Sequence, residues 1–111
     1  MKKKVVWLGS SKRDLLNMPR KVIEEFGHGL YLAQLGMRHQ SAKTLKGGTI
    51  ELIEDHDTDT YRAVYTVNIG DAVYVLHCFK KKSKKGGEVP KPDRELIEAR
   101  LKMAREHAKG R

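Results

Sequence analysis

Apolar residues recur along the chain with two different periods, and these periods predict its secondary structure. Steps of three and four residues follow Pro19, a residue that suits the first turn of a new helix and not the interior of an old one. We therefore expect a short helix near residues 11–16 and a longer one from about Met18 to Gln34 or Met37. The face that this longer helix lays on a sheet is formed by Val22, Phe26, Leu30, Ala33 and Met37. Gly27 and Gly29 lie within the helix and suggest close packing against a neighbouring element.

Runs of β-branched and aromatic residues predict four strands, at residues 5–8, 49–54, 60–67 and 72–79. The polar stretch from Arg38 to Gly48 reads as a loop. Asp93 is expected to cap a final helix whose apolar stripe is Ile97, Leu101, Ala104 and Ala108. The order β-α-α-β-β-β-α predicts a single α+β domain spanning residues 1–111, with an antiparallel meander sheet and the helices gathered on one side of it.

The two central strands, at residues 60–67 and 72–79, form the hairpin around which the chain is organised. If its turn is symmetric about Ile69 and Gly70, Arg62 lies opposite His77 on one face. A bulged loop would instead shift the pairing by one residue, so that Arg62 and His77 would be diagonal neighbours on different faces.

The charge is uneven along the chain, which carries +9 in total. Residues 77–111 hold 12 of the 23 lysines and arginines but only 5 of the 14 acidic residues. A positive face of this kind favours nucleic acid or an acidic protein as the partner, although basicity alone is weak evidence. No apolar run is long enough for a membrane span or a signal-peptide core, and the single cysteine excludes an internal disulfide, so a cytoplasmic location without membrane contact is expected.

Arg62 stands among apolar residues, so its guanidinium must meet a carboxylate, a carbonyl or an anion. One interpretation pairs it with an acid of the preceding loop. The other places it in an anion site fed by the basic residues that follow the last strand, where alternation sends Lys80 and Lys82 to one side and Lys81 to the other. A solvated lysine run is the commoner outcome for such a cluster.

Neither a metal nor a cofactor is expected. His77 and Cys78 lack the further ligands of a zinc set, and Cys78 is most simply a small buried strand residue. The acidic stretch at residues 54–59 lacks the glycine and the distal glutamate of a calcium loop and reads as a polar hairpin link. Any catalysis would therefore depend on arginine, lysine and histidine.

Three motifs and a run in the last helix give the chain a resemblance to a known family. The motifs are Ser-Ala-Lys-Thr-Leu-Lys-Gly at 41–47, Thr-Tyr-Arg-Ala-Val-Tyr at 60–65 and Tyr-Val-Leu-His-Cys-Phe-Lys-Lys-Lys-Ser at 74–83, and the run is Arg-Leu-Lys-Met-Ala at 100–104. With these residues the chain resembles the phage-derived toxins of the RelE/ParE superfamily, close to the HigB-like toxins of type II toxin–antitoxin pairs. The resemblance covers nearly the whole chain and keeps the order of elements.

The resemblance implies a metal-independent endoribonuclease that cleaves messenger RNA, free or on the ribosome, and is neutralised by an antitoxin, expected to be a helix-turn-helix DNA-binding protein. In such toxins the ribose 2′-hydroxyl attacks the scissile phosphate. Carried onto this chain, the catalytic candidates are Arg62, His77 and Lys80, with His77 either a proton carrier or a core residue. The residues implied to grip RNA are Lys46, Lys80, Lys81, Lys82, Lys84 and Lys85.

The chain departs from the family pattern at its C-terminal end. Related enzymes carry a tyrosine or histidine there as acid/base group, whereas the last tyrosine here is Tyr74 and only His107 lies late. Some superfamily members inhibit DNA gyrase by binding and cleave nothing. A gyrase-inhibiting toxin and a non-catalytic basic nucleic-acid-binding module therefore stand as alternative functions.

Overall fold

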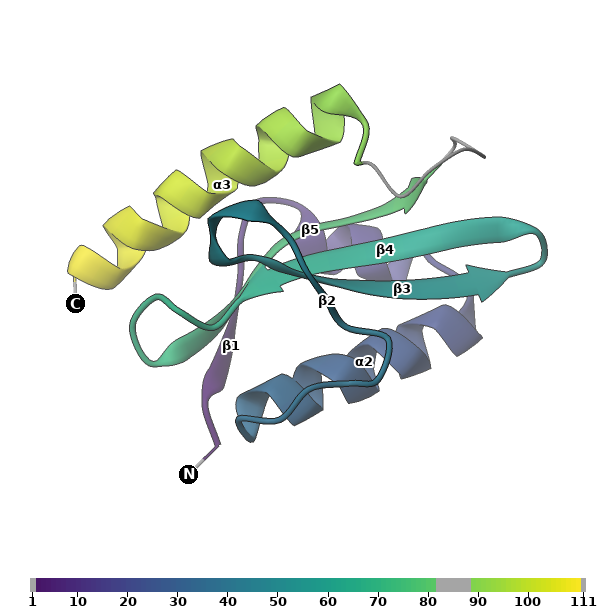
Figure 1. Cartoon of the computed structure of the whole chain (residues 1–111), viewed down its shortest axis with the longest axis horizontal. Coiled ribbons are helices and arrows are strands. Elements are labelled where there is room, and N and C mark those ends of the chain that lie inside the picture. Colours follow the sequence, from purple (N-terminus) through teal and green to yellow (C-terminus); the bar gives the residue numbers. More distant parts are fainter. Residues whose placement is uncertain (1, 82–88, 111) are drawn as a thin grey trace.

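The computed structural model describes residues 2–81 and 89–110 and has a five-stranded sheet between two helical layers (Figure 1). The strands lie in the order β1-β5-β4-β3-β2; β1 is parallel to β5 and the other neighbours are antiparallel. The elements are β1 (Lys4–Trp7), α1 (Ser11–Leu16), α2 (Arg20–Gln34), β2 (Lys43–Thr44), a 3₁₀ turn η1 (Lys46–Gly48), β3 (Ile50–His56), β4 (Asp59–Thr66), β5 (Ala72–Lys81) and α3 (Lys91–Lys109). The predicted α+β class and the order of helices and long strands are confirmed.

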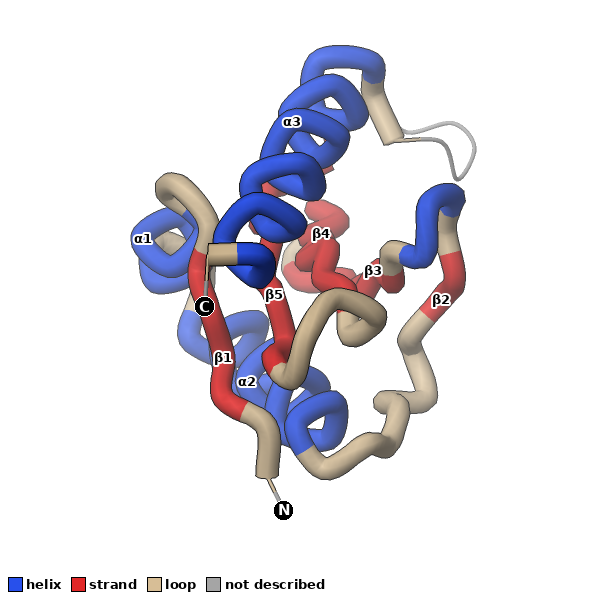
Figure 2. Tube along the Cα trace, turned by 90° about the vertical axis from the view of Figure 1, so that its left-hand side faces the viewer, coloured by secondary structure: helices blue, strands red, loops and turns tan. Residues whose placement is uncertain are grey.

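The expectation that all helices lie on one side is wrong. The helices α1 and α2 cover one face of the sheet and α3 covers the other, as Figure 2 shows from the edge. The cause lies in β5, which buries Val73 and Val75 on the α2 face and Tyr74 and Leu76 on the α3 face. A strand that is apolar on both faces requires a cover on each.

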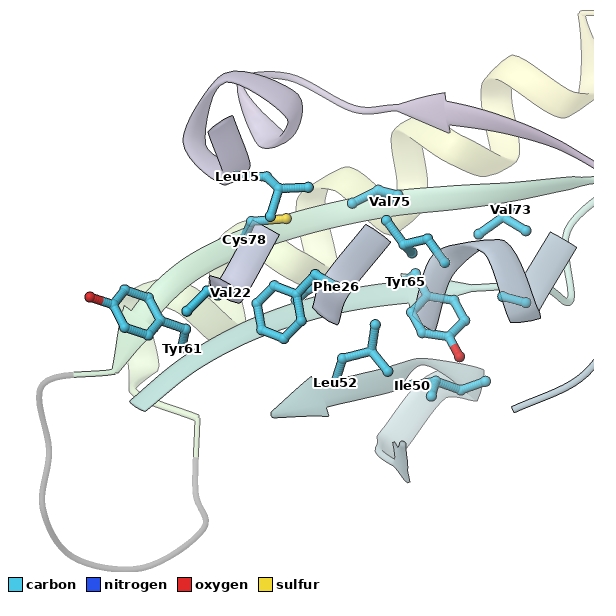
Figure 3. Close-up of a cluster of buried hydrophobic side chains, with 13 residues drawn as sticks. Leu15, Val22, Phe26, Ile50, Leu52, Tyr61, Tyr65, Val73, Val75 and Cys78 are labelled. Atoms are coloured by element: carbon cyan, nitrogen blue, oxygen red, sulfur yellow. The ribbon is translucent and has the colours of Figure 1, made fainter. Parts of the chain in front are cut away.

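The face covered by α2 holds the larger of two cores (Figure 3). Val22, Phe26, Leu30 and Ala33 are buried as the helical period predicts, whereas Met37 lies beyond the helix and is exposed. Gly29 faces Leu52 so closely that an added Cβ would lie 2.7 Å from its Cδ1, which explains one of the two helix glycines.

Two segment boundaries differ from the prediction. The stretch from Arg38 to Gly48, expected to be a loop, contains the edge strand β2 and the turn η1, which are too short to produce an apolar period. The last helix begins at Lys91, after Pro90, and not at a cap on Asp93. Its predicted stripe is confirmed, since Ile97, Leu101 and Ala104 are buried. No helix in the described ranges is both long and apolar enough to cross a membrane.

The register of the central hairpin differs from the symmetric alternative, and near the turn, where Thr66 lies opposite Tyr74, it is shifted by one residue as in the bulged alternative. Arg62 lies opposite Phe79, and Val64 lies opposite His77, whereas Tyr65 lies opposite Val75. Leu76 is therefore an extra residue in β5, and the pairing shifts at this bulge.

The bulge changes which side chains share a face. Leu76 packs in the core under α3, and the next residue, His77, hydrogen-bonds Asp93 of α3, so both point to the same side. The Leu76 carbonyl, which the bulge takes out of the regular ladder, accepts a hydrogen bond of 2.9 Å from Arg100 Nη1. A buried arginine of α3 thus holds the bulge in place.

Candidate nucleic-acid interface

A row of polar side chains crosses the α3 face of the sheet. Lys43 of β2 lies opposite Glu51 of β3, Glu51 lies opposite Val64 of β4, and Val64 lies opposite His77 of β5. Directly opposed residues on neighbouring strands point to the same side. Arg62, two residues from Val64 on the same strand, belongs to this face as well. The fold thus gathers four polar residues from four strands.

Arg62 is buried and held by Glu51. Its Nη1 donates to both carboxylate oxygens of Glu51 at 2.7 Å, and the residues are 5% and 0% exposed. The sequence-based interpretation that Arg62 forms a structural ion pair expected its partner among the acids of the loop before β4. That partner is wrong, because the ion pair forms with Glu51 of β3. Glu51 stands between Ile50 and Leu52, on the polar side of an alternating strand, and only the strand pairing brings it to Arg62.

His77 lies on the same face as Arg62, next to Phe79. Its Nε2 is 2.7 Å from Asp93 Oδ1, and its ring stacks on Phe79 with centroids 4.5 Å apart and planes 14° apart. Because Phe79 is the direct partner of Arg62, His77 and Arg62 are diagonal neighbours around this ring. His77 is 7% exposed, and its buried Nδ1 has no hydrogen-bond partner among the described residues.

The predicted lysines do not all join Arg62 and His77. Lys80 lies opposite Tyr61, whose side chain packs on the α2 face, and it pairs with Asp59 at 3.7 Å. Lys81 points to the face of Arg62, as alternation requires, and is 5% exposed. The side chain of Lys80 therefore points away from Arg62, although Lys80 and His77 both line a pocket of about 420 Å³. Lys82, Lys84 and Lys85 lie outside the described residues.

A cavity of about 550 Å³ opens beside this polar row, between the segment 43–49 and α3. Lys43, Lys46 and Arg94 line it together with one acidic residue, Glu98, so its rim is mainly cationic. Its apolar lining is formed by Leu45, Val89, Ile97 and Leu101. An apolar floor with cations at the rim suits the base and the phosphate of one nucleotide.

Sequence reasoning found Lys46 but did not select Lys43, Arg94, Glu51 or Asp93. Lys43 lies in the same motif as Lys46, at residues 41–47, and this motif was the feature of the sequence that could have indicated it. Arg94 is one of several basic residues of an amphipathic helix, and only the tertiary packing shows that it reaches the cavity.

Tyr74 and His107 form a second polar contact under α3, with the phenol oxygen 2.9 Å from His107 Nδ1. Tyr74 lies opposite Thr66, four residues along β4 from Arg62. At roughly 3.3 Å per strand residue this separates the pair from Arg62 by about 13 Å. The pair therefore does not supply the missing acid/base group to a phosphate bound at Arg62.

The described residues contain no group of three or more histidine, cysteine, aspartate or glutamate side chains arranged to hold a metal ion. The acidic stretch at 54–59 belongs to the hairpin of β3 and β4, as predicted, but only Asp57 and Thr58 form its turn, both with positive φ, while residues 54–56 end β3 and Asp59 begins β4. Cys78 is buried in β5, and burial together with the nearby carboxylate of Asp14 raises the pKa of its thiol to about 12, although Arg100 opposes the shift. The thiol is therefore protonated at neutral pH and unsuited to nucleophilic chemistry.

The family model described as "Phage derived protein Gp49-like (DUF891)" matches residues 13–102. The match spans most of the chain, including α2, the central hairpin and most of α3. The chain belongs to this family, which is a family of RelE-like toxins in toxin–antitoxin systems. Neither a curated protein nor a solved structure significantly matches the sequence.

Proposed function

We propose that this protein is the toxin of a type II toxin–antitoxin pair, of the HigB-like branch, and that it cleaves messenger RNA without a metal ion. The observation that carries the proposal is the placement of Arg62 and His77 around Phe79, beside a cavity with a cationic rim, in a member of a RelE-like toxin family. Cleavage of messenger RNA in the cytoplasm, free or on the ribosome, would halt translation.

In the proposed reaction the ribose 2′-hydroxyl forms a bond to the scissile phosphorus while the bond to the 5′-oxygen breaks. His77 takes the proton of the 2′-hydroxyl, and the 5′-oxygen leaves with a proton from water. The products are a cyclic phosphate and a 5′-hydroxyl. Arg62 stabilises the negative charge that develops on the phosphoryl oxygens.

The low exposure of Arg62 and His77, 5% and 7%, sets a requirement for this reaction. The start of α3 must move away from the sheet when RNA binds, and the contact that must lengthen is the one between His77 and Asp93. Movement of an element that covers a site is a common step in substrate binding by enzymes.

The cavity gives the RNA strand a place to bind. A base packs on Leu45, Ile97 and Leu101 while Lys43, Lys46 and Arg94 contact the backbone phosphates. In the proposal Lys80, Lys81, Lys82, Lys84 and Lys85 also bind RNA, and Lys80 is given no catalytic role because its side chain lies on the opposite face from Arg62.

The test is cleavage of a messenger RNA by the purified protein in EDTA, mapped by primer extension. We expect His77→Gln and Arg62→Lys each to lower the cleavage rate by about 10²-fold or more, because each removes a group that acts in the transition state. Arg20→Gln is the matched control, since it removes one positive charge from an exposed site at the start of α2. Full cleavage by both site variants would refute the proposed roles.

One observation favours a second function, a non-catalytic nucleic-acid-binding module. Glu51 already neutralises Arg62, so the guanidinium is less available to a phosphate than a free arginine. In that case the protein binds RNA in the same assay without cleaving it. The double variant Lys43→Gln/Lys46→Gln then makes the slope of log K against log salt concentration shallower by about 0.7 for each lost phosphate contact. In that case expression of neither the parent protein nor any variant arrests growth.

The proposed partner is a cognate antitoxin with a helix-turn-helix DNA-binding domain, encoded in a neighbouring reading frame. Co-expression of that neighbouring frame should restore growth to cells that express this chain and should yield a complex on purification. Growth arrest that persists in its presence would exclude that protein as the antitoxin.

A further inference from the structure

A second cavity, of about 200 Å³, lies at the other side of the segment 43–49. Its walls come from Lys3, from residues 33–38 at and beyond the end of α2, from residues 44–50, and from residues 65–68 at the end of β4. Thr49 lines both cavities, so the segment that carries Lys43 and Lys46 is a shared wall between them. None of the catalytic candidates lines this second cavity.

Tyr65 is one of the residues that line this cavity, and its buried hydroxyl is unsatisfied. The residue is 0% exposed, and its phenol oxygen has no hydrogen-bond partner among the described residues. Figure 3 shows the ring within the apolar cluster, with the hydroxyl directed towards Ile50. Burial raises the pKa of Tyr65, while the positive charge of Arg38 opposes that rise, so the phenol is a neutral donor near a guanidinium. Buried polar groups without a partner are uncommon in proteins and require an explanation.

The charged residues at the cavity are both cations. Lys3 and Arg38 line it, whereas no acidic side chain does so among the described residues. Arg38 Nη2 donates to Thr44 Oγ1 at 3.0 Å, which fixes the guanidinium at the rim and leaves its remaining N–H groups for a ligand. Asn68 also lines the cavity and can donate through its amide.

The volume limits the size of the ligand. About 200 Å³ exceeds the roughly 30 Å³ that a water molecule occupies in the liquid. It is smaller than the roughly 300–1,000 Å³ of sites that take larger organic ligands. A tetrahedral oxyanion fits both the volume and a lining of two cations and a phenolic donor.

We propose that this cavity binds a phosphate group, either free or at the end of a nucleotide, through Tyr65, Arg38 and Lys3. A bound anion would accept the Tyr65 O–H and would join the start of β1, the end of α2 and the segment 43–49. It would therefore brace the wall that carries Lys43 and Lys46. The proposal depends on neither RNA cleavage nor the identity of the toxin's target.

The experiment is a calorimetric titration of the full chain with inorganic phosphate, with a nucleoside 5′-monophosphate and with the unphosphorylated nucleoside. We expect saturable binding of at least one phosphate compound and none of the nucleoside. Tyr65→Phe keeps the buried ring and removes only the hydroxyl, and should weaken binding at least about tenfold, the effect of losing one hydrogen bond to a charged group. Arg38→Gln should weaken it as well.

Arg20→Gln is the matched control, because it removes one exposed charge at the start of α2 from a residue that lines neither cavity, and it should leave phosphate binding unchanged. Binding of inorganic phosphate with the same affinity as the monophosphate would identify a free anion as the ligand, and saturation by the monophosphate alone would identify a nucleotide. The proposal is overturned if neither phosphate compound binds saturably. It is equally overturned if folded Tyr65→Phe binds as tightly as the parent protein, which would leave the hydroxyl facing an ordered water only.

Discussion

Arg62 Nη1 lies 2.7 Å from both carboxylate oxygens of Glu51, and this ion pair is buried in the sheet beneath α3. Arg62→Ala would leave the Glu51 charge buried without this partner, so we expect the free energy of unfolding to fall by about 3–5 kcal/mol. Urea denaturation measures the change. Under the proposed function, a loss of growth arrest in Arg62→Ala would then report unfolding as well as chemistry.

Two variants separate these contributions to the Arg62→Ala effect. Glu51→Gln/Arg62→Gln removes both charges and should lose less stability than Arg62→Ala, because neither Glu51 nor Arg62 is left as a buried charge without the other. Arg20→Ala breaks an exposed pair with Glu24 and should change stability by no more than about 0.5 kcal/mol. Equal losses in Arg62→Ala and Arg20→Ala would contradict a structural role for the buried pair.

Asp93 connects α3 to β5 through His77 at 2.7 Å. Asp93→Asn keeps the shape of the side chain but removes its charge, and should cost about 0.5–1.5 kcal/mol of stability. Under the proposed function it should also loosen α3 over the site and change the cleavage rate. Glu95→Gln, an exposed carboxylate two residues further along α3, is the matched control for the charge lost near the helix start. If both variants have the same urea midpoint, the contact to His77 contributes nothing.

Gly29 and Gly27 lie on the same helix in different surroundings. A Cβ at Gly29 would lie 2.7 Å from Leu52 Cδ1, so Gly29→Ala should destabilise the protein by about 1–3 kcal/mol through overpacking. A Cβ at Gly27 meets nothing within 4 Å, so Gly27→Ala should stabilise the protein by up to about 1 kcal/mol through helix propensity. Thermal unfolding of the two variants should shift in opposite directions. If both variants unfold at a higher temperature than the parent protein, the Leu52 side chain moves aside without a loss of stability.

The Cys78 thiol should make the fold sensitive to alkali. Its pKa of about 12 in the folded protein exceeds the roughly 8.5 of a free thiol, so above that lower value the unfolded chain loses a proton that the folded chain keeps. Stability is therefore unaffected by this group below about pH 8.5, and it falls by up to about 1.4 kcal/mol per unit as the pH rises towards 12. Urea midpoints of the parent and Cys78→Ala between pH 8 and 10, under reducing conditions, measure the difference. Parallel pH profiles would contradict the assigned shift.

The local pattern of the sequence determined the elements and their buried faces. The stripes of α2 and α3, the strands of the hairpin and the burial of Cys78 follow from side-chain period and residue type, which are local properties. The motifs also indicate Arg62, His77 and Lys46 as candidate site residues from the sequence alone. That both Arg62 and Lys81 point to the α3 face follows from the same alternation once the strand pairing is set.

Only the tertiary structure decided which surfaces meet. An apolar stripe indicates that a helix packs on a sheet, but it does not indicate which face of the sheet the helix covers. The position of α3 therefore followed only from its packing. The hairpin register depended on the bulge at Leu76, which is held by Arg100 from 24 residues further along the chain. For the same reason the partner of Arg62 was found on a neighbouring strand and not in the nearest acidic loop. Long-range pairing, which a single sequence does not encode as a local period, brings Lys43, Glu51, Arg62 and His77 to one face of the sheet.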